Sequence, residues 1–543
     1  MKKYIFLSTA LLLLIASCSN DENNEQKEPT QAVQFSFTNE EFGEDEALTR
    51  ANAAEAKPQI VDLGDCEAEI TVESEPTAKT RGALSPANGH YTIRAYQSGT
   101  LKGEMKGTFG GPMWAPTFTP DASSKDKLRL PYGTYDFVAF NDDVTVSGTN
   151  LTTTRDKAET ARMGFATVTI TGPTPVYVQF TMKHVGARLR MEFICKKDIP
   201  NTTTVLEATA ANVVPASIAY NPTTKAYTTT NGAMMPATSN LPSTEVNPPL
   251  STWGRDYAFK TTSDYFYFLP STEVSNLKFS FSGAKIFWEP ITAAQKLNFA
   301  LSMQANKSYL VKIKLKPLYT YLMSDGTTGH FKDTTFGGGS KTPIAVVLDK
   351  NNRIAIALHD AGTATSWCPY PVWSIQANTN TVTTAQDALT THPTSGYDET
   401  WDASYSTSAV TGNKVKGLNP NFTAFKSAAD YNPGVAYTGS PALKWFLPSS
   451  SDWKMPFSLG FANIPAVPQV LQYYDWYGNL FASTFTQVGG TALIPYKEYW
   501  TSSEIKDKWA ETVFLFIERS VQWGSGQYKS AMGNYRVRPF VKY

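Results

Sequence analysis

Alternation of apolar and polar side chains is the feature of this sequence that most restricts its fold. The pattern is clearest in residues 176–182, VYVQFTM, and it returns in residues 33–37, 277–281 and 309–315. Period-two alternation places apolar side chains on one face of a strand, as a half-buried sheet requires. Residues 165–170 precede the first of these runs across a turn that contains Gly and Pro, so we expect two consecutive antiparallel strands.

Three domains are expected from the length of 543 residues and from a change of texture after residue 317. Beyond that point alternation is lost, three consecutive glycines occur at 337–339, and most of the tryptophans gather. The predicted fold is mainly β. It comprises two antiparallel β-sandwich domains, residues 31–190 and 191–318, followed by a loop-rich α+β domain over residues 319–543.

The composition supports folded cores and excludes one class of partner. The chain is 41% hydrophobic, and its net charge of +0 gives no basic field that would attract nucleic acid. Cys66, Cys195 and Cys368 are odd in number and far apart, which suits neither a disulfide framework nor a zinc site. We expect each to be a small buried side chain, and we expect no cofactor or metal.

The first residues have the three parts of a secretory signal. Lys2 and Lys3 precede an apolar run over residues 4–16, and small residues end it. The run is too short to span a bilayer permanently. We therefore expect a signal peptide over residues 1–17 and a solvated acidic tether over residues 18–30.

Residues 14–18, LIASC, resemble the lipobox of bacterial lipoproteins. The resemblance implies that Cys18 becomes the first mature residue and carries acyl chains, such as palmitate, that hold the protein to a membrane. Ser19 and the acidic residues after it resemble the surface-export signal of Bacteroides-type lipoproteins, which implies the outer face of the outer membrane. The alternatives are an ordinary cleaved signal and a flexible linker that faces the periplasm.

Three segments resemble the fimbrillin-like proteins of Bacteroides-type bacteria, the subunits of type V pili: residues 91–96, 130–140 and 180–190. The resemblance implies transthyretin-like β-sandwich domains and an assembly mechanism. A surface protease cuts such pilins after an arginine and releases the lipid with an N-terminal strand. A strand from another pilin subunit then fills the open sheet edge, which is β-strand addition. The expected partners are therefore other pilin subunits.

Residues 33–37 are the candidate leaving strand in this scheme. Arg50 follows in an acidic, polar stretch and is the first choice for the protease site, because a flexible Arg-Ala bond suits a trypsin-like protease. Arg81 is the second choice. The alternative is that both arginines are ordinary solvated linker residues.

The C-terminal third resembles the C-type-lectin-like domains of Bacteroides-type surface proteins, in residues 444–453, 499–504 and 536–540. Residues 342–348 and 354–358 resemble the entry hairpin of such a domain. The calcium-binding tripeptides of sugar-binding C-type lectins are absent from the sequence, which puts calcium-dependent binding in doubt.

One aromatic segment is the candidate contact for a receptor or glycan. Tyr473, Tyr474, Trp476 and Tyr477 stand within five positions and precede Gly and Asn, which favours a loop. Trp523 is the second candidate. The alternative is that these rings pack in the core, where large aromatics supply burial that regular elements do not.

No catalytic constellation is apparent in the sequence, so we expect a non-enzyme. Glu504 and Glu511 are the candidate glycosidase pair, but their spacing alone supports that no better than chance. The chain ends directly after the strand expected to close the last domain, with no spare donor strand. We therefore expect a tip adhesin. The competing classes are a lipid-anchored surface protein that binds glycans and a hydrolase.

Overall fold

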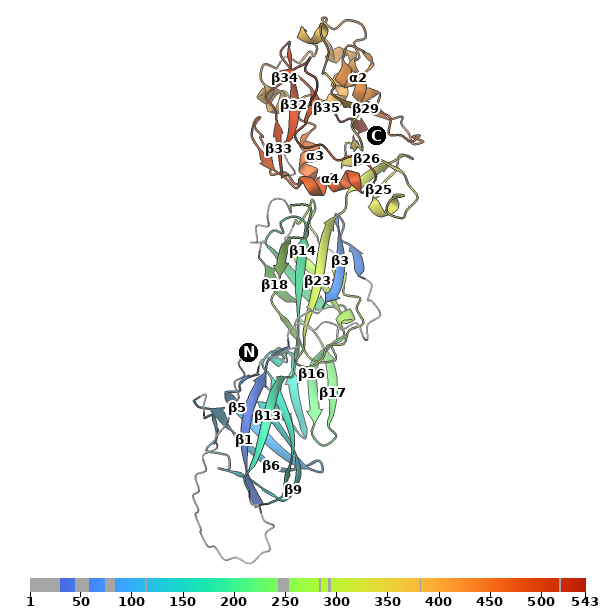
Figure 1. Ribbon diagram of the computed structural model, residues 1–543. Helices are drawn as coiled ribbons and strands as arrows, with labels where there is room; N and C mark the ends of the chain where they lie inside the picture. The colour runs from blue at the N-terminus through green and yellow to red at the C-terminus, as the bar shows by residue number, and fades with distance from the viewer. Residues whose placement is uncertain are drawn as a thin grey trace, which may run out of the picture.

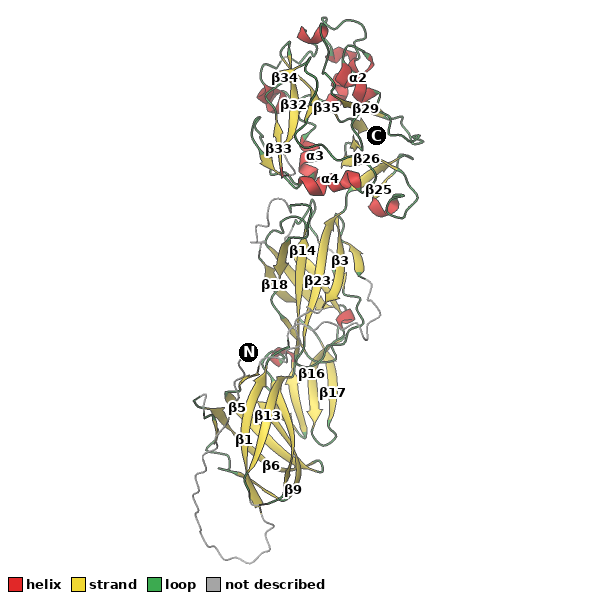
Figure 2. Cartoon of the chain, viewed as in Figure 1, coloured by secondary structure: helices red, strands yellow, loops and turns green. Residues whose placement is uncertain are grey.

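The computed structural model describes residues 30–43, 58–73, 84–112, 115–172, 174–242, 253–282, 285–291, 294–380, 382–516 and 519–543. Figure 1 shows an elongated molecule with an N-terminal, a middle and a C-terminal region in a row. Strands dominate the first two regions, and the α-helices gather in the third, as Figure 2 shows. The prediction of a mainly β protein is confirmed.

A nine-stranded sheet forms most of the N-terminal region, in the order β4-β1-β13-β12-β9-β5-β6-β7, with β8 also paired to β1. Its aromatic core includes Phe37, Tyr91, Phe109, Phe137 and Phe180. The bounds are β1 Thr30–Glu40, β4 Leu84–Pro86, β5 Gly89–Gln97, β6 Thr100–Gly110, β7 Thr117–Pro120, β8 Leu128–Pro131, β9 Gly133–Asn141, β12 Arg162–Ile170 and β13 Val176–His184.

A four-stranded sheet, β10-β11-β16-β17, packs against this large sheet. The contact buries Val138 and Phe140 from the large sheet with Leu151, Ile218 and Tyr220 from the small one. The bounds are β10 Thr145–Ser147, β11 Asn150–Thr154, β16 Val214–Asn221 and β17 Ala226–Gly232.

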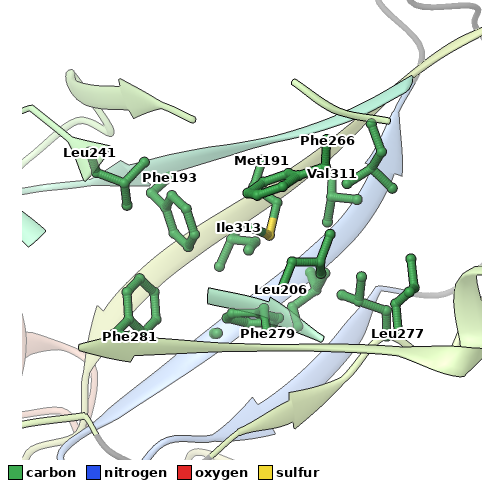
Figure 3. Close-up of a cluster of buried hydrophobic side chains, with 14 of the residues drawn as sticks. Met191, Phe193, Leu206, Leu241, Phe266, Leu277, Phe279, Phe281, Val311 and Ile313 are labelled. Atoms are coloured by element: carbon green, nitrogen blue, oxygen red, sulfur yellow. The ribbon is translucent and has the colours of Figure 1, made fainter. Parts of the chain in front are cut away.

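Two sheets face each other in the middle region. Figure 3 shows Phe193 and Ile313 from one sheet packed toward Leu206 and Phe279 from the other. The first sheet is β19-β14-β23-β3-β2 with β20 beside β14, and the second is β18-β15-β21-β22. The bounds are β2 Gln59–Asp62, β3 Cys66–Glu73, β14 Ala187–Cys195, β15 Thr202–Ala208, β18 Ala237–Leu241, β19 Phe259–Thr262, β20 Phe266–Phe268, β21 Leu277–Ser282, β22 Gln295–Lys296 and β23 Ser308–Pro317.

Two hairpins cross the boundary predicted near residue 190. The β2–β3 hairpin precedes it in sequence, but β3 pairs with β23 of the middle region. The β16–β17 hairpin follows it, but β16 pairs with β11 of the N-terminal region. Most strand pairs of these sheets are antiparallel, as predicted, but β1 runs parallel to β13 and β14 runs parallel to β23. Alternation reports which face of a strand is buried but carries no information on the direction of its neighbour.

The C-terminal region holds two sheets, β25-β24-β26-β27-β36-β29 and β28-β35-β31-β32-β33-β30, with β34 beside β32. Residues 342–348 and 354–358, expected to form a hairpin, include β26 and β27, which pair antiparallel, and the late strand β36 pairs with β27. The strand bounds are β24 Thr320–Met323, β25 Thr328–His330, β26 Pro343–Asp349, β27 Ile354–Ala357, β28 Gly362–Thr363, β29 Lys444–Phe446, β30 Tyr474–Asp475, β31 Glu498–Ile505, β32 Trp509–Phe516, β33 Ser520–Trp523, β34 Gln527–Tyr528, β35 Tyr535–Val537 and β36 Phe540–Lys542.

Helices in the described residues are short. The α-helices are α1 Gly396–Trp401, α2 Thr423–Ala429, α3 Lys454–Leu459 and α4 Gly478–Thr486. Single turns of other helix types span Arg155–Lys157, Val274–Asn276, Phe331–Asp333, Val372–Ser374, Asp387–Thr391, Ala403–Tyr405 and Lys416–Leu418. Among the described residues, no helix has the length and apolar character needed to cross a bilayer.

Aromatic rings join the middle and C-terminal regions. The Tyr477 hydroxyl donates to Asp198 Oδ1 at 2.6 Å and accepts from the Asp198 backbone N–H at 3.1 Å. Its ring stacks on Trp253, with centroids 5.2 Å apart, and Phe461 stacks on Trp288 at 4.9 Å. These ring contacts, together with the two hydrogen bonds of Tyr477, join one region to the other.

Candidate functional site

Strand β1 is an interior strand of the large sheet, although it begins the described chain. It runs parallel to β13 in the register Val33↔Val176 to Glu40↔Lys183. Its other edge pairs with β8 at residues 30–33 and with β4 at residues 38–40. Removal of β1 would therefore leave β13 with an unpaired edge over residues 176–183, and an unpaired edge is a template for another strand.

The side chains of β1 that face the core are large and tightly packed. Phe37 is 3% exposed, and its ring centroid lies 4.7 Å from that of Tyr91, 5.0 Å from Phe109 and 5.2 Å from Phe180. Val33 is 5% exposed, while Gln34 between them is exposed. Burial of each large apolar side chain contributes about 1.5–3 kcal/mol, so β1 is held by its side chains as well as by main-chain hydrogen bonds.

Residues 41–43, here named the junction segment, continue β1 to the middle region. The Glu41 carboxylate pairs with Arg162 Nη2 at 2.7 Å and accepts from Ser85 Oγ at 3.2 Å. Asn306 Nδ2, in the loop before β23, donates to the Glu41 carbonyl at 3.4 Å. The Phe42 ring stacks on His184 with centroids 3.7 Å apart. The junction segment therefore contacts both regions.

Arg162, and not His184, is the cation that pairs with Glu41 near pH 7. Burial opposes ionisation of Glu41, but the hydrogen bond and charge of Arg162 outweigh burial, and the pKa of Glu41 is lowered. Burial, with the charge of Arg162, lowers the pKa of His184 to about 4. His184 is therefore neutral near pH 7, and its 3.3 Å contact with Glu41 supplies no ion pair there.

The predicted lipidation and protease sites, Cys18, Arg50 and Arg81, lie outside the described residues. The strands that precede each arginine in the sequence are the ones that each cut would separate from the rest of the chain. A cut after Arg50 separates β1 alone, whereas a cut after Arg81 separates β1, β2 and β3. Strand β3 carries Cys66, Ala68 and Ile70, all fully buried in the middle core. The second cut would therefore open two sheets and the first cut only one.

Four of the five predicted ligand-contact residues are buried, which corrects the prediction of an exposed aromatic loop. Tyr474 is 6% exposed, Trp476 4%, Tyr477 7% and Trp523 0%. Trp476 and Trp523 pack on Phe457 with centroids 5.8 and 5.1 Å away. A covered ring cannot stack on a ligand from solution, so these four side chains serve packing and the contact between regions. Tyr473, 51% exposed, is the one that remains available.

A surface cavity of about 550 Å³ lies elsewhere in the C-terminal region, between the β26–β27 turn and the end of β36. Its lining includes Asn351, Arg353, Tyr397, Lys542 and Tyr543. Arg353 lies over the Tyr543 ring and Lys542 over the Tyr397 ring, at 5.2 and 5.1 Å from the centroids. Amide groups beside aromatic rings are typical of a pocket that binds a polar ligand.

The two carboxylates considered for catalysis, Glu504 and Glu511, are buried in the C-terminal region. Glu504 is fully buried, forms an ion pair with Lys529, and accepts backbone hydrogen bonds from Ala377 and Asn378. Glu511 is fully buried, and burial raises its pKa well above the usual value. Neither side chain reaches solvent to meet a substrate. Among the described residues, no three His, Cys, Asp or Glu side chains gather as a metal site.

The three described cysteines are free and buried, as the sequence analysis expected. Burial raises the pKa of Cys195 to about 11 and that of Cys368 to about 12. A thiol of high pKa is a poor nucleophile near neutral pH. These cysteines therefore act as small core side chains.

Comparison with known proteins gives structural neighbours only. No family model and no curated protein sequence matches the chain. A fimbrial protein from Bacteroides ovatus is 11% identical, with 94% of this chain and 99% of that protein covered and a TM-score of 0.25. A fimbrial protein from Bacteroides vulgatus is also 11% identical, with 45% and 92% covered and a TM-score of 0.27. A Bacteroides uniformis protein described in terms of cell adhesion is 15% identical, with 42% and 91% covered and a TM-score of 0.29.

These neighbours are fimbrial and cell adhesion proteins of Bacteroides. Their TM-scores are too low to establish a shared fold. The function proposed below therefore rests on the pairing and burial of β1 in this chain.

Proposed function

We propose that this protein is an adhesive subunit of a cell-surface type V pilus. It would be exported as a lipoprotein acylated at Cys18, cut after Arg50, and assembled when a strand of another subunit replaces β1. The observation that carries the proposal is β1 itself. It is an interior strand whose sequence lies upstream of the predicted cut, and it is paired on both edges and packed through Phe37.

Strand replacement at this position satisfies the physical requirements of β-strand addition. The unpaired edge of β13 supplies main-chain donors and acceptors, and the spaces left by Val33 and Phe37 supply pockets for alternate side chains. A cut after Arg50 favours this outcome over a cut after Arg81, because it leaves β3 in the middle core. The middle region then stays closed while the N-terminal sheet opens.

We propose the tip of the pilus as the position of this subunit and the C-terminal region as its adhesive head. Strand β36 is paired on both sides, with β27 and β29, and Val541 is fully buried. Such a strand cannot be given to a neighbouring subunit without opening its own sheet. Acceptance of a strand at β13, together with a β36 that stays in its own sheet, supports a place at one end of a polymer.

The test is N-terminal sequencing with intact-mass measurement of the protein taken from the cell surface. A chain that starts at Ala51 without acyl mass is the expected result. The Arg50→Ala variant should keep acylated Cys18, and the matched Arg81→Ala variant should be processed normally. A start at Gly82 in the unaltered protein would move the cut and would imply that the middle sheet opens as well.

The second candidate is a permanently lipid-anchored outer-membrane protein that binds glycans. The cavity beside Tyr397 and Tyr543 favours it, because its amides, cations and rings suit a polar ligand such as a sugar. This function predicts that acylated Cys18 remains at the N-terminus of the surface protein. The same measurement therefore separates the two candidates.

A further inference from the structure

We propose that the space left by β1 selects an incoming strand with a carboxylate four residues beyond the aromatic side chain that takes the place of Phe37. These are the relative positions of Phe37 and Glu41 in β1 and the junction segment. The inference rests on the proposed strand replacement and adds one chemical requirement on the strand that replaces β1. An Asp or Glu side chain at that position would pair with Arg162, as Glu41 does.

Arg162 is the group that demands the carboxylate. Its side chain is 14% exposed, and among the described ion pairs it contacts only Glu41. Its second terminal nitrogen, Nη1, is buried without a hydrogen-bond partner in the described residues. Departure of the segment before Ala51 would remove Glu41 and leave a mostly buried guanidinium without its carboxylate. A charged group that loses its partner in such a position is costly, so an incoming carboxylate restores the pair.

The four-residue spacing between Phe37 and Glu41 is fixed by contacts at both positions. Phe37 is held among Tyr91, Phe109 and Phe180, and a shift by one residue would turn it out of the core. At the other end, Asn306 Nδ2 contacts the Glu41 carbonyl, and Asn306 O accepts from the Gly43 N–H at 3.3 Å. An incoming strand in the same register therefore brings its fourth residue after the aromatic to Arg162.

Glu40 provides a matched control one residue away. Its carboxylate pairs with Lys183 at 3.3 Å, but the Lys183 side chain is 54% exposed. Its Oε1 also accepts from Asn306 Nδ2 at 3.2 Å. Loss of this pair has a smaller effect, because the Lys183 ammonium that remains is exposed and solvated by water, whereas the Arg162 guanidinium is mostly buried. The selectivity should therefore belong to the position of Glu41 and not to acidity of the strand in general.

The experiment uses the full secreted chain with a specific protease site inserted after Arg50. The chain is cut, and labelled synthetic peptides of residues 30–43 compete for the place of β1, followed by fluorescence anisotropy. The peptides are the native sequence, Glu41→Gln and Glu40→Gln. We expect the Glu41→Gln peptide to bind about tenfold more weakly than the native one. The Glu40→Gln peptide should stay within about threefold.

A charge exchange provides the second measurement. The Arg162→Glu protein should bind a Glu41→Arg peptide more tightly than the native peptide, and its circular dichroism checks that it is folded. Equal binding of the native and Glu41→Gln peptides would overturn the carboxylate requirement and leave strand replacement intact. Failure of the native peptide to bind the cut chain would overturn strand replacement itself. The two failures are therefore distinguishable.

Discussion

Phe37→Ala should sharply weaken retention of β1 once the chain has been cut after Arg50. Phe37 is 3% exposed and lies within 5.2 Å, centroid to centroid, of three aromatic rings. Truncation of a buried Phe to Ala destabilises by about 3–5 kcal/mol, through lost burial and the cavity that remains. Tenfold in equilibrium corresponds to about 1.4 kcal/mol, so the dissociation constant of β1 should rise by at least about 100-fold.

The assay is native mass spectrometry of the cut chain, which separates the complex that keeps β1 from the chain that has lost it. Gln34→Ala is the matched control, because Gln34 lies on the same strand with its side chain exposed. Its retention should differ from that of the native chain by less than about threefold, as expected of a surface substitution. Equal retention of β1 in the Phe37→Ala and Gln34→Ala chains would refute the argument that buried side chains hold this strand.

Three further predictions concern pH and the C-terminal region. The pKa of His184 is lowered from 6.5 to about 4 on folding, so its contribution to stability is complete above pH 6.5 and is lost as pH falls toward 4. Urea unfolding should therefore show about 2 kcal/mol less stability at pH 5 than at pH 7, and His184→Gln should reduce this difference. Tyr477→Phe should cost about 0.5–1.5 kcal/mol in urea unfolding, because the partly buried hydrogen bonds to Asp198 are lost; an unchanged midpoint would contradict the role of this contact. Lys529→Met should cost about 3–5 kcal/mol by leaving the Glu504 carboxylate buried without its cation, and thermal unfolding should show partial recovery when Glu504→Gln is added.

The strands were predictable from the sequence, but their partners were not. Alternation located β1, β12, β13, β21 and β23, because it depends only on which face of a strand is buried. The pairing of Val33 with Val176 joins distant parts of the chain and leaves no local mark in either segment. The exchange of β2 and β3 into the middle sheet was missed for the same reason.

The candidate site was predicted in part. Residues 33–37 were identified from the sequence as the candidate leaving strand. In the structure they belong to β1, inside the large sheet. Glu41 was missed because it is one acid within the run NEEFGEDE, and charge alone does not show which acid meets a buried arginine. Phe42, a lone aromatic in that run, was the available signal. In the aromatic segment, four rings in five positions were interpreted as an exposed loop, whereas Tyr477 meets Asp198 of the middle region.

The orientation of β1 has a mechanical consequence. In Figure 1, β1 and β13 lie roughly along the long axis of the molecule, and the junction segment continues β1 toward the middle region. A pull on the C-terminal region would run along that axis. Hydrogen bonds between strands lie across the strand direction. Such a load would therefore shear all the hydrogen bonds between β1 and β13 together, rather than break them one after another. A strand that occupies this position would yield only when its entire ladder of hydrogen bonds slides.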